Sequence, residues 1–443
     1  MNFASEKKTR QIKVGHKVHE IRVQRDLFGR LLPLAMEDNI DVEKTLSYPI
    51  TSVPMSLCHA DGTLHQTPKS AMVGVLTSNS INDEVPRRFD AVIFDGFFLL
   101  HTMKDIPKTF GNISKKIMSI LTATHARRVD VVFDQYFSPS IKEYERAQRH
   151  EVRNREYFIT GPEQVRPVDF IKELLNLNYK ECYIYSAHNN SVTYAYDNLS
   201  CQNHEEADTK IIFHICQMDN DVSDVLIKTS DTDILIVMLG NMDHLRNNNL
   251  KIYMEYGTMH SKKWINISEL QITLGPLLCQ SLPGFHALTG CDFNPYFLRR
   301  GEKKPYKLLE KNILYQKAFA ALGTDEFVCR MYGMNCDDVN DARYHKFLAT
   351  YKTSGTKVFK KTRISYDSSN LPPCQRELRQ QLLRTVYITH IWRNSHLKEP
   401  TVLTPEGNGW NLIDENYTGE LNNEESDDDE ELITDVSDYD ENK

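Results

Sequence analysis

The sequence of 443 residues has no long apolar stretch, which excludes a membrane-spanning helix. Such a helix needs about 20 consecutive apolar residues, and the longest candidate here, residues 91–100, contains Asp95. The first 17 residues are rich in lysine, whereas a signal peptide requires an apolar segment there. We therefore expect no membrane association and an intracellular protein, with the nucleus favoured over the cytoplasm.

Cysteine is sparse and has no pairing pattern. The nine cysteines are an odd number and include no C-x-x-C pair, so a disulfide framework is excluded and free thiols in a reducing compartment are expected. With 40% hydrophobic and 26% charged residues, the chain has the composition of a globular protein. Its length suffices for two or three packed units.

Negative charge is unevenly spread along the chain. The formal net charge is −8, but residues 414–443 hold fourteen acidic residues against one lysine, a net charge of −13. The other 413 residues therefore carry +5. A mildly basic body permits a polyanionic partner. We expect the acidic tail to be disordered and to bind basic proteins, or to compete with nucleic acid for the protein's own basic residues.

Short apolar runs alternate with helical stretches from residue 89 onward. Strands buried on both faces are predicted at runs rich in valine, isoleucine, phenylalanine and tyrosine, namely 91–95, 129–134, 181–187, 225–231 and 233–239. Helices are predicted at 113–126 and 205–218 between them, and at 304–322 and 372–392 after them. This alternation indicates an α/β fold with a mostly parallel central sheet, followed by a helical region.

The same pattern divides the chain into four parts. They are an N-terminal extension without an assigned role (1–88), the α/β domain (89–295), a helical C-terminal region (296–400), and a strap with the acidic tail (401–443). The predicted helix 372–392 has a row of apolar residues on one face, so we expect it to pack against the body; a partner-binding face is the alternative.

Carboxylates follow several of the predicted strands. Asp95, Asp134 and Asp231 each close an apolar run. The carboxyl ends of parallel strands meet at one edge of a sheet, where ligands bind. Further acids lie at the start of helix 205–218 and after the run FHALTG. Seven side chains are therefore expected at this edge: Asp95, Asp134, Glu206, Asp208, Asp231, Asp233 and Asp292.

Each of these acids alone has a plain structural interpretation. An aspartate after a strand is commonly a turn former or a helix N-cap, and residues 230–233 alone fit a hydrogen-bonded turn. Together, crowded like charges raise one another's pKa and destabilise a fold unless cations neutralise them. Carboxylates without histidine or thiolate suit Mg²⁺, or alternatively Mn²⁺. Two such ions about 3.5–4 Å apart serve phosphodiester hydrolysis in nucleases.

The ordered motifs FDG (94–96), VFDQ (132–135), EEAD (205–208), SDTD (230–233) and TGCD (289–292) resemble the seven-carboxylate signature of the flap-endonuclease and xeroderma-type structure-specific nucleases, a branch of the PIN-like fold. The resemblance implies a three-layer PIN-like domain with two metal ions. It assigns Asp95, Asp134, Glu206 and Asp208 to the first ion, and Asp231, Asp233 and Asp292 to the second.

A second, looser resemblance extends over more of the chain. It is carried by SVPMSLCHADGT (52–63), HEEADTK (204–210) and LPPCQRELRQQLLRTVYITHIW (371–392). These segments are similar to PIN-like proteins of the asteroid type, which occur in many copies in invertebrate genomes. Some members of that group lack catalytic acids, whereas all seven positions are acidic here.

Basic residues form two clusters beside the acids. Lys142, Arg146, Arg149 and Arg153 have a helical spacing that places four cations in one stripe within 138–160. In the resembled nucleases the corresponding insertion is an arch that steers the scissile phosphate, so the resemblance implies that these four residues act in catalysis; a solvated helix face is the alternative. The second cluster is expected to bind nucleic acid: Arg299, Arg300, Lys303, Lys304 and Lys307.

These residues predict an Mg²⁺-dependent nuclease that hydrolyses phosphodiester bonds of DNA, or alternatively RNA, by a two-metal-ion mechanism. Two other functions fit the same sequence. One is a catalytically inactive PIN-like scaffold that binds nucleic acid or protein. The other is a hydrolase of small phosphoesters, which would not need the basic stripe.

Overall fold

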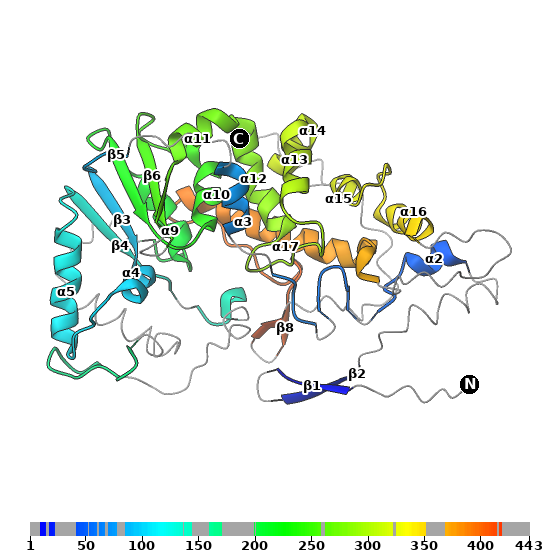
Figure 1. Ribbon diagram of the computed structural model, residues 1–443, viewed down its shortest axis with the longest axis horizontal. Coiled ribbons are helices and arrows are strands. Elements are labelled where there is room, and N and C mark those ends of the chain that lie inside the picture. Colours follow the sequence, from blue (N-terminus) through cyan, green and yellow to red (C-terminus); the bar gives the residue numbers. More distant parts are fainter. Residues whose placement is uncertain are drawn as a thin grey trace.

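The central element of the computed structural model is a five-stranded sheet with helices on both faces (Figure 1). Within the described part of the chain, no helix is both long and apolar enough to cross a membrane. The structure describes residues 9–14, 17–22, 41–51, 53–59, 62–66, 70–77, 85–135, 137–143, 159–170, 199, 201–257, 262–321, 325–350, 368–413 and 416–418.

The sheet is mostly parallel, as the sequence predicts. Its strands are β3 (Ala91–Asp95), β4 (Arg128–Val132), β5 (Asp224–Lys228), β6 (Lys251–Tyr256) and β7 (Lys263–Asn266), in the order β4-β3-β5-β6-β7. The first four strands of this order run parallel, and β7 is antiparallel to β6. The carboxyl ends of β3, β4 and β5 therefore lie at one edge.

Successive side chains of a strand point to opposite faces, and this alternation separates two layers of core. Val92 and Phe94 of β3 pack with side chains of α5 (Phe110–Thr122) on one face. Ala91 and Ile93 belong to the main core on the other face, which includes α9 (Ala207–Cys216) and α10 (Asp233–Gly240). The architecture thus has three layers.

The prediction of a strand at 233–239 is wrong, because these residues form α10. All seven are buried, and a continuous apolar run has no periodicity that separates a buried helix from a buried strand. Topology decides in favour of the helix. The neighbouring strands β5 and β6 are parallel, and parallel neighbours need a crossover connection, usually a helix.

Other elements differ less from the sequence expectation. Strands β6 and β7 were not predicted, because charged Glu255 interrupts the apolar run of β6 and because β7 has only four residues, two of them polar. The predicted strands 129–134 and 225–231 end earlier, at Val132 and Lys228. The predicted strand 181–187 lies outside the described residues.

The helical region after the sheet encloses a long buried helix, α12 (Pro276–Thr289). It is preceded by α11 (Ile267–Leu274) and packs against α10, α14 (Ile313–Ala321) and α17 (Gln375–Arg393). The prediction that 372–392 packs against the body is therefore confirmed. The predicted helix 304–322 is two helices, α13 (Lys303–Lys311) and α14, separated by extended Asn312. The remaining helices are α15 (Asp325–Met331) and α16 (Val339–Thr350).

Part of the N-terminal extension is built into the body. The extension contains a hairpin of β1 (Thr9–Val14) and β2 (Lys17–Arg22) and the helices α2 (Val42–Leu46) and α3 (Ser70–Leu76). Leu57 and Met72 belong to the main core. The backbone N–H groups of Tyr296 and Leu298 donate to carbonyls of His65 and Ser56 at 3.0 and 2.8 Å. Ser56 and His65 therefore border the segment that follows Asp292.

The C-terminal strap also packs on the body. It forms a small antiparallel hairpin of β8 (Asn411–Ile413) and β9 (Asn416–Thr418). The ring of Trp410 lies 5.1 Å from that of Tyr387 on α17, and the backbone carbonyl of Gly409 accepts a hydrogen bond from Arg384. The acidic residues 419–443 lie outside the described part of the chain.

Close packing of α12 and α14 depends on Gly284. A Cβ atom there would lie 2.8 Å from the backbone oxygen of Phe319, so we expect Gly284→Ala to lower the free energy of unfolding by about 1–3 kcal/mol. The matched control is Gly74→Ala in α3, where no atom lies within 4 Å and stability should rise by about 0.5–1 kcal/mol. Urea unfolding measures both; equal effects would contradict the close contact.

Candidate metal centre

The acids predicted from the sequence sit at the ends of separate elements. Asp95 is the last residue of β3, Asp134 lies two residues beyond β4, and Asp231 three residues beyond β5. Asp233 begins α10, Glu206 is the N-cap of α9, and Asp292 follows α12. The parallel sheet brings the first three to a common edge, and the helix ends supply the others.

Three of these acids form a group with the geometry of a cation site. Ligand oxygens of Asp231, Asp233 and Asp292 all lie within 4.8 Å of one another. Among the described residues, these are the three side chains with possible metal ligands whose ligand atoms lie this close together. The bonds of Mg²⁺ to oxygen are about 2.1 Å long. Small shifts of these side chains would therefore bring all three oxygens to binding distance of one cation. The residues present therefore fit a divalent cation.

Hydrogen bonds hold two of these carboxylates, Asp231 and Asp233, in place. Asp231 Oδ1 accepts from the backbone N–H of Asp233 at 2.9 Å, which is the turn that residues 230–233 alone suggest. Asp233 Oδ1 lies 3.1 Å from Nε2 of His286 on α12. The imidazole is buried and stacks on Trp392, with ring centroids 5.7 Å apart. The site is therefore supported by α12 and α17 as well as by the sheet.

Asp95 and Asp134 have structural roles beside any role in cation binding. Asp95 Oδ1 accepts from the backbone N–H of Phe98 and caps α4 (Gly96–Thr102). Asp134 Oδ1 accepts from the backbone N–H of Ala207, the first residue of α9, at 2.7 Å. The helix-cap interpretation therefore holds for Asp95. Asp134 accepts one of the free backbone N–H groups at the start of α9, although it belongs to a different segment of the chain.

Burial raises the pKa of Asp95 to about 7, and the nearby charges of Asp134 and Asp231 add to the shift. A carboxyl group whose pKa is higher in the folded than in the unfolded state reduces stability as the pH rises between the two values. For Asp95 this window extends from about 4 to about 7. Without a cation, the ionised site is therefore a source of instability at neutral pH.

We expect Asp95→Asn to raise the melting temperature in EDTA, and to raise it more at pH 8 than at pH 5. The amide cannot ionise but can still accept the hydrogen bond that caps α4. Thermal unfolding of both proteins at the two pH values measures the difference. An equal shift at pH 5 and pH 8 would show that ionisation of Asp95 does not limit stability.

Lys142 lies among the acids, as its predicted catalytic role requires. Its Nζ is 2.9 Å from Oε1 of Glu206 and 3.7 Å from Oδ2 of Asp292. Burial raises the pKa of Glu206, and the ammonium group of Lys142 opposes that shift. Asp208 lies in the first turn of α9, two residues beyond Glu206. The other residues of the predicted stripe, Arg146, Arg149 and Arg153, lie outside the described residues.

Two residues of the site were missed by sequence reasoning. His286 contacts Asp233 as described above, and the buried hydroxyl of Thr229 donates to Asp95 at 3.3 Å. Thr229 also accepts from the backbone N–H of Asp231, so it links the ends of β3 and β5. Thr229 lies directly after β5 and two residues before Asp231, and this position in the sequence could have identified it as part of the site. His286 lies within an apolar helix and offered none.

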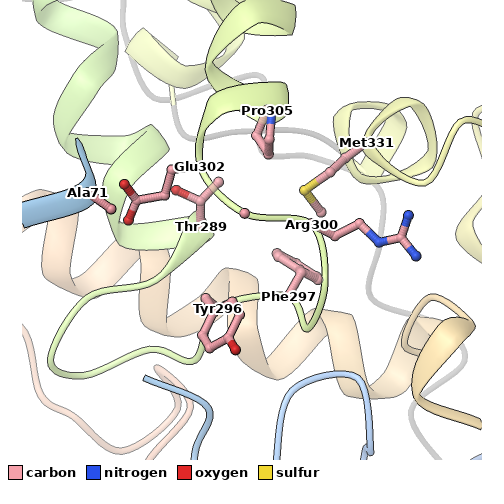
Figure 2. A pocket seen from close by; sticks show the side chains of 9 residues that line it. Ala71, Thr289, Tyr296, Phe297, Arg300, Glu302, Pro305 and Met331 are labelled. Atoms are coloured by element: carbon pink, nitrogen blue, oxygen red, sulfur yellow. The ribbon is translucent and has the colours of Figure 1, made fainter. Parts of the chain in front are cut away.

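In the second basic cluster Arg300 is half-buried, and the other four residues are exposed. The guanidinium carbon of Arg300 lies 4.0 Å from the centroid of the Tyr332 ring, and the same side chain lines a cavity of about 170 Å³. In Figure 2 its guanidinium group points away from Glu302 and Thr289, which lie on the opposite side of this cavity. Arg299 bonds to Asn370 at 2.5 Å. The exposed lysines lie on α13: Lys303, Lys304 and Lys307.

The chain was compared with known proteins. No protein-family model matches it, and no curated protein sequence does.

Proposed function

We propose that this protein is a metal-dependent nuclease with a PIN-like fold, acting on DNA in preference to RNA. The observation that carries the proposal is the convergence of Asp231 and Asp233, from the turn before α10, with Asp292, from the segment after α12, and with Lys142 beside them. Acids at the carboxyl edge of a parallel sheet suit a hard cation, and a neighbouring ammonium group suits a phosphate.

Each part of the site has a distinct role in this proposal. A bound Mg²⁺ or Mn²⁺ would neutralise charge on the phosphodiester and acidify water. Asp231, Asp233 and Asp292 supply the ligand oxygens, and His286 orients Asp233. Lys142 presents a positive charge at the border of the site, where it can contact a phosphate oxygen of the substrate.

The exposed lysines of α13 are the candidate surface for the rest of the substrate. Lys303, Lys304 and Lys307 follow Asp292 closely in the chain and lie on the first turns of one helix. Such lysines contact the phosphate backbone without reading its sequence. Binding through them weakens steeply as the salt concentration rises.

One observation favours a second candidate function. Lys142 already neutralises part of the negative charge of Glu206 and Asp292, so this part of the acidic site can persist in a protein without cations. A non-catalytic scaffold that binds nucleic acid through the same basic residues is therefore the alternative. It predicts binding of nucleic acid without cleavage.

The deciding experiment is a cleavage assay with the full chain. Labelled single-stranded, flapped and duplex DNA, with matched RNA, are incubated in Mg²⁺, in Mn²⁺ and in EDTA. We expect cleavage that requires the cation. Binding without cleavage of any substrate would support the scaffold instead. A small phosphoester is assayed alongside, and cleavage of it alone would indicate a hydrolase of small phosphoesters.

A further inference from the structure

Lys142 occupies a place inside the acidic site that a cation would otherwise take. Its ammonium group lies 2.9 Å from the Glu206 carboxylate and 3.7 Å from that of Asp292. The same group lies 5.0 Å from the centroid of the Phe293 ring, a distance typical of a cation–π contact. Glu206, Asp292 and the aromatic ring therefore all stabilise one positive charge at this position.

The backbone on both sides of this contact is anchored. Ser140 and Ile141, directly before the lysine, are buried. The Ser140 hydroxyl donates to Oε1 of Glu205 at 2.8 Å, and Gln135 N–H donates to the Glu205 carbonyl at 2.6 Å. Glu205 precedes Glu206, so the segment that carries Lys142 is tied to the same helix start that carries its main partner.

The carboxylates of the acidic site fall into two groups, which differ in their partners. On one side, Asp231, Asp233 and Asp292 converge within 4.8 Å. On the other side, Glu206 bonds to Lys142, while Asp134 accepts a backbone N–H of α9. A divalent cation bound to Glu206 needs a carboxylate oxygen at about 2.0–2.6 Å, and the ammonium group of Lys142 already neutralises this carboxylate through Oε1.

We propose that the site binds one divalent cation, at Asp231, Asp233 and Asp292, and that the ammonium group of Lys142 replaces a second one. This inference rests on the cation site of the proposed function, and it replaces the two ions predicted from the sequence by one. The lysine then has two uses, because it neutralises Glu206 in the resting protein and remains beside the substrate phosphate when the cation binds.

The test counts bound Mn²⁺ in the full chain by calorimetry and by electron paramagnetic resonance. The acidic tail offers further carboxylates to cations, so each count is taken relative to an Asp231→Asn/Asp233→Asn variant, which keeps the tail. We expect one ion in the wild type and in Lys142→Arg, and two in Lys142→Met, with the resonance signal broadened by a second nearby Mn²⁺. Lys262→Met is the control, because Lys262 pairs with Glu255 at 2.6 Å elsewhere in the fold.

Each outcome distinguishes the two proposals. Two ions in the wild type would overturn the single-ion inference and leave the nuclease proposal standing. If the wild type binds no more Mn²⁺ than the Asp231→Asn/Asp233→Asn variant, both proposals are overturned. One ion in a folded Lys142→Met protein would show that Lys142 does not exclude the second. If Lys142→Met does not fold, the wild-type count still decides.

Discussion

Replacing Asp231 and Asp233 together by asparagine should reduce cleavage of nucleic acid in Mg²⁺ on the order of a thousandfold or more. These residues provide two of the three carboxylates that converge on the candidate cation site. Asparagine has nearly the same shape and can still accept the backbone N–H that Asp231 accepts. The expected loss therefore follows from the removed charges and leaves the turn intact. Initial cleavage rates at saturating Mg²⁺ measure it.

The chain offers a matched control at the opposite end of the same strand. Asp219 and Asp221 have the same spacing but precede β5, and each forms an exposed ion pair, with Arg246 and Arg127 respectively. Exposed pairs contribute little to stability. Asp219→Asn/Asp221→Asn should cleave like the wild type. Cleavage that survives in the Asp231/Asp233 variant would remove the basis of the nuclease proposal.

The largest effect on stability is expected for Arg343→Met. Arg343 and Glu377 are both buried, and their side chains join α16 to α17 at 3.5 Å. Arg343 also donates to the carbonyl of Pro372 at 2.6 Å. Removing the arginine leaves a buried carboxylate without this compensating charge, which costs about 3–5 kcal/mol in comparable pairs. The free energy of unfolding in urea measures the loss.

A double variant separates charge from packing. In Arg343→Met/Glu377→Gln both charges are absent, and the glutamine can still accept the backbone N–H of Cys374 that Glu377 accepts at 2.8 Å. Most of the lost stability should return. A double variant as unstable as Arg343→Met would mean that the carbonyl of Pro372 and the packing of the arginine carry the effect.

The positions of the acids along the chain were predictable from local signals. The run 91–95 is apolar and ends in Asp95, and it forms β3 as expected. Asp231 follows β5 and Glu206 lies at the start of α9, also as expected. Strand formation and helix starts depend on neighbouring residues, so a sequence pattern is enough to place them.

The run 233–239 shows where local signals fail. Its residues are apolar without a period, and the same composition suits a strand or a buried helix. The parallel pairing of β5 with β6 requires a crossover, and α10 supplies it. The need for a crossover helix depends on which strands pair in the sheet, so it cannot be inferred from a short stretch of sequence.

By itself the sequence determined the fold class and the end of the sheet at which acids gather, and it predicted a hard divalent cation there because carboxylates without soft ligands prefer one. Only the tertiary structure decided which acids converge, because distances between Asp231, Asp233 and Asp292 depend on how α10 and α12 pack on the sheet. It also placed Lys142 against Glu206, a contact across 64 residues of chain that spacing along the sequence does not reveal.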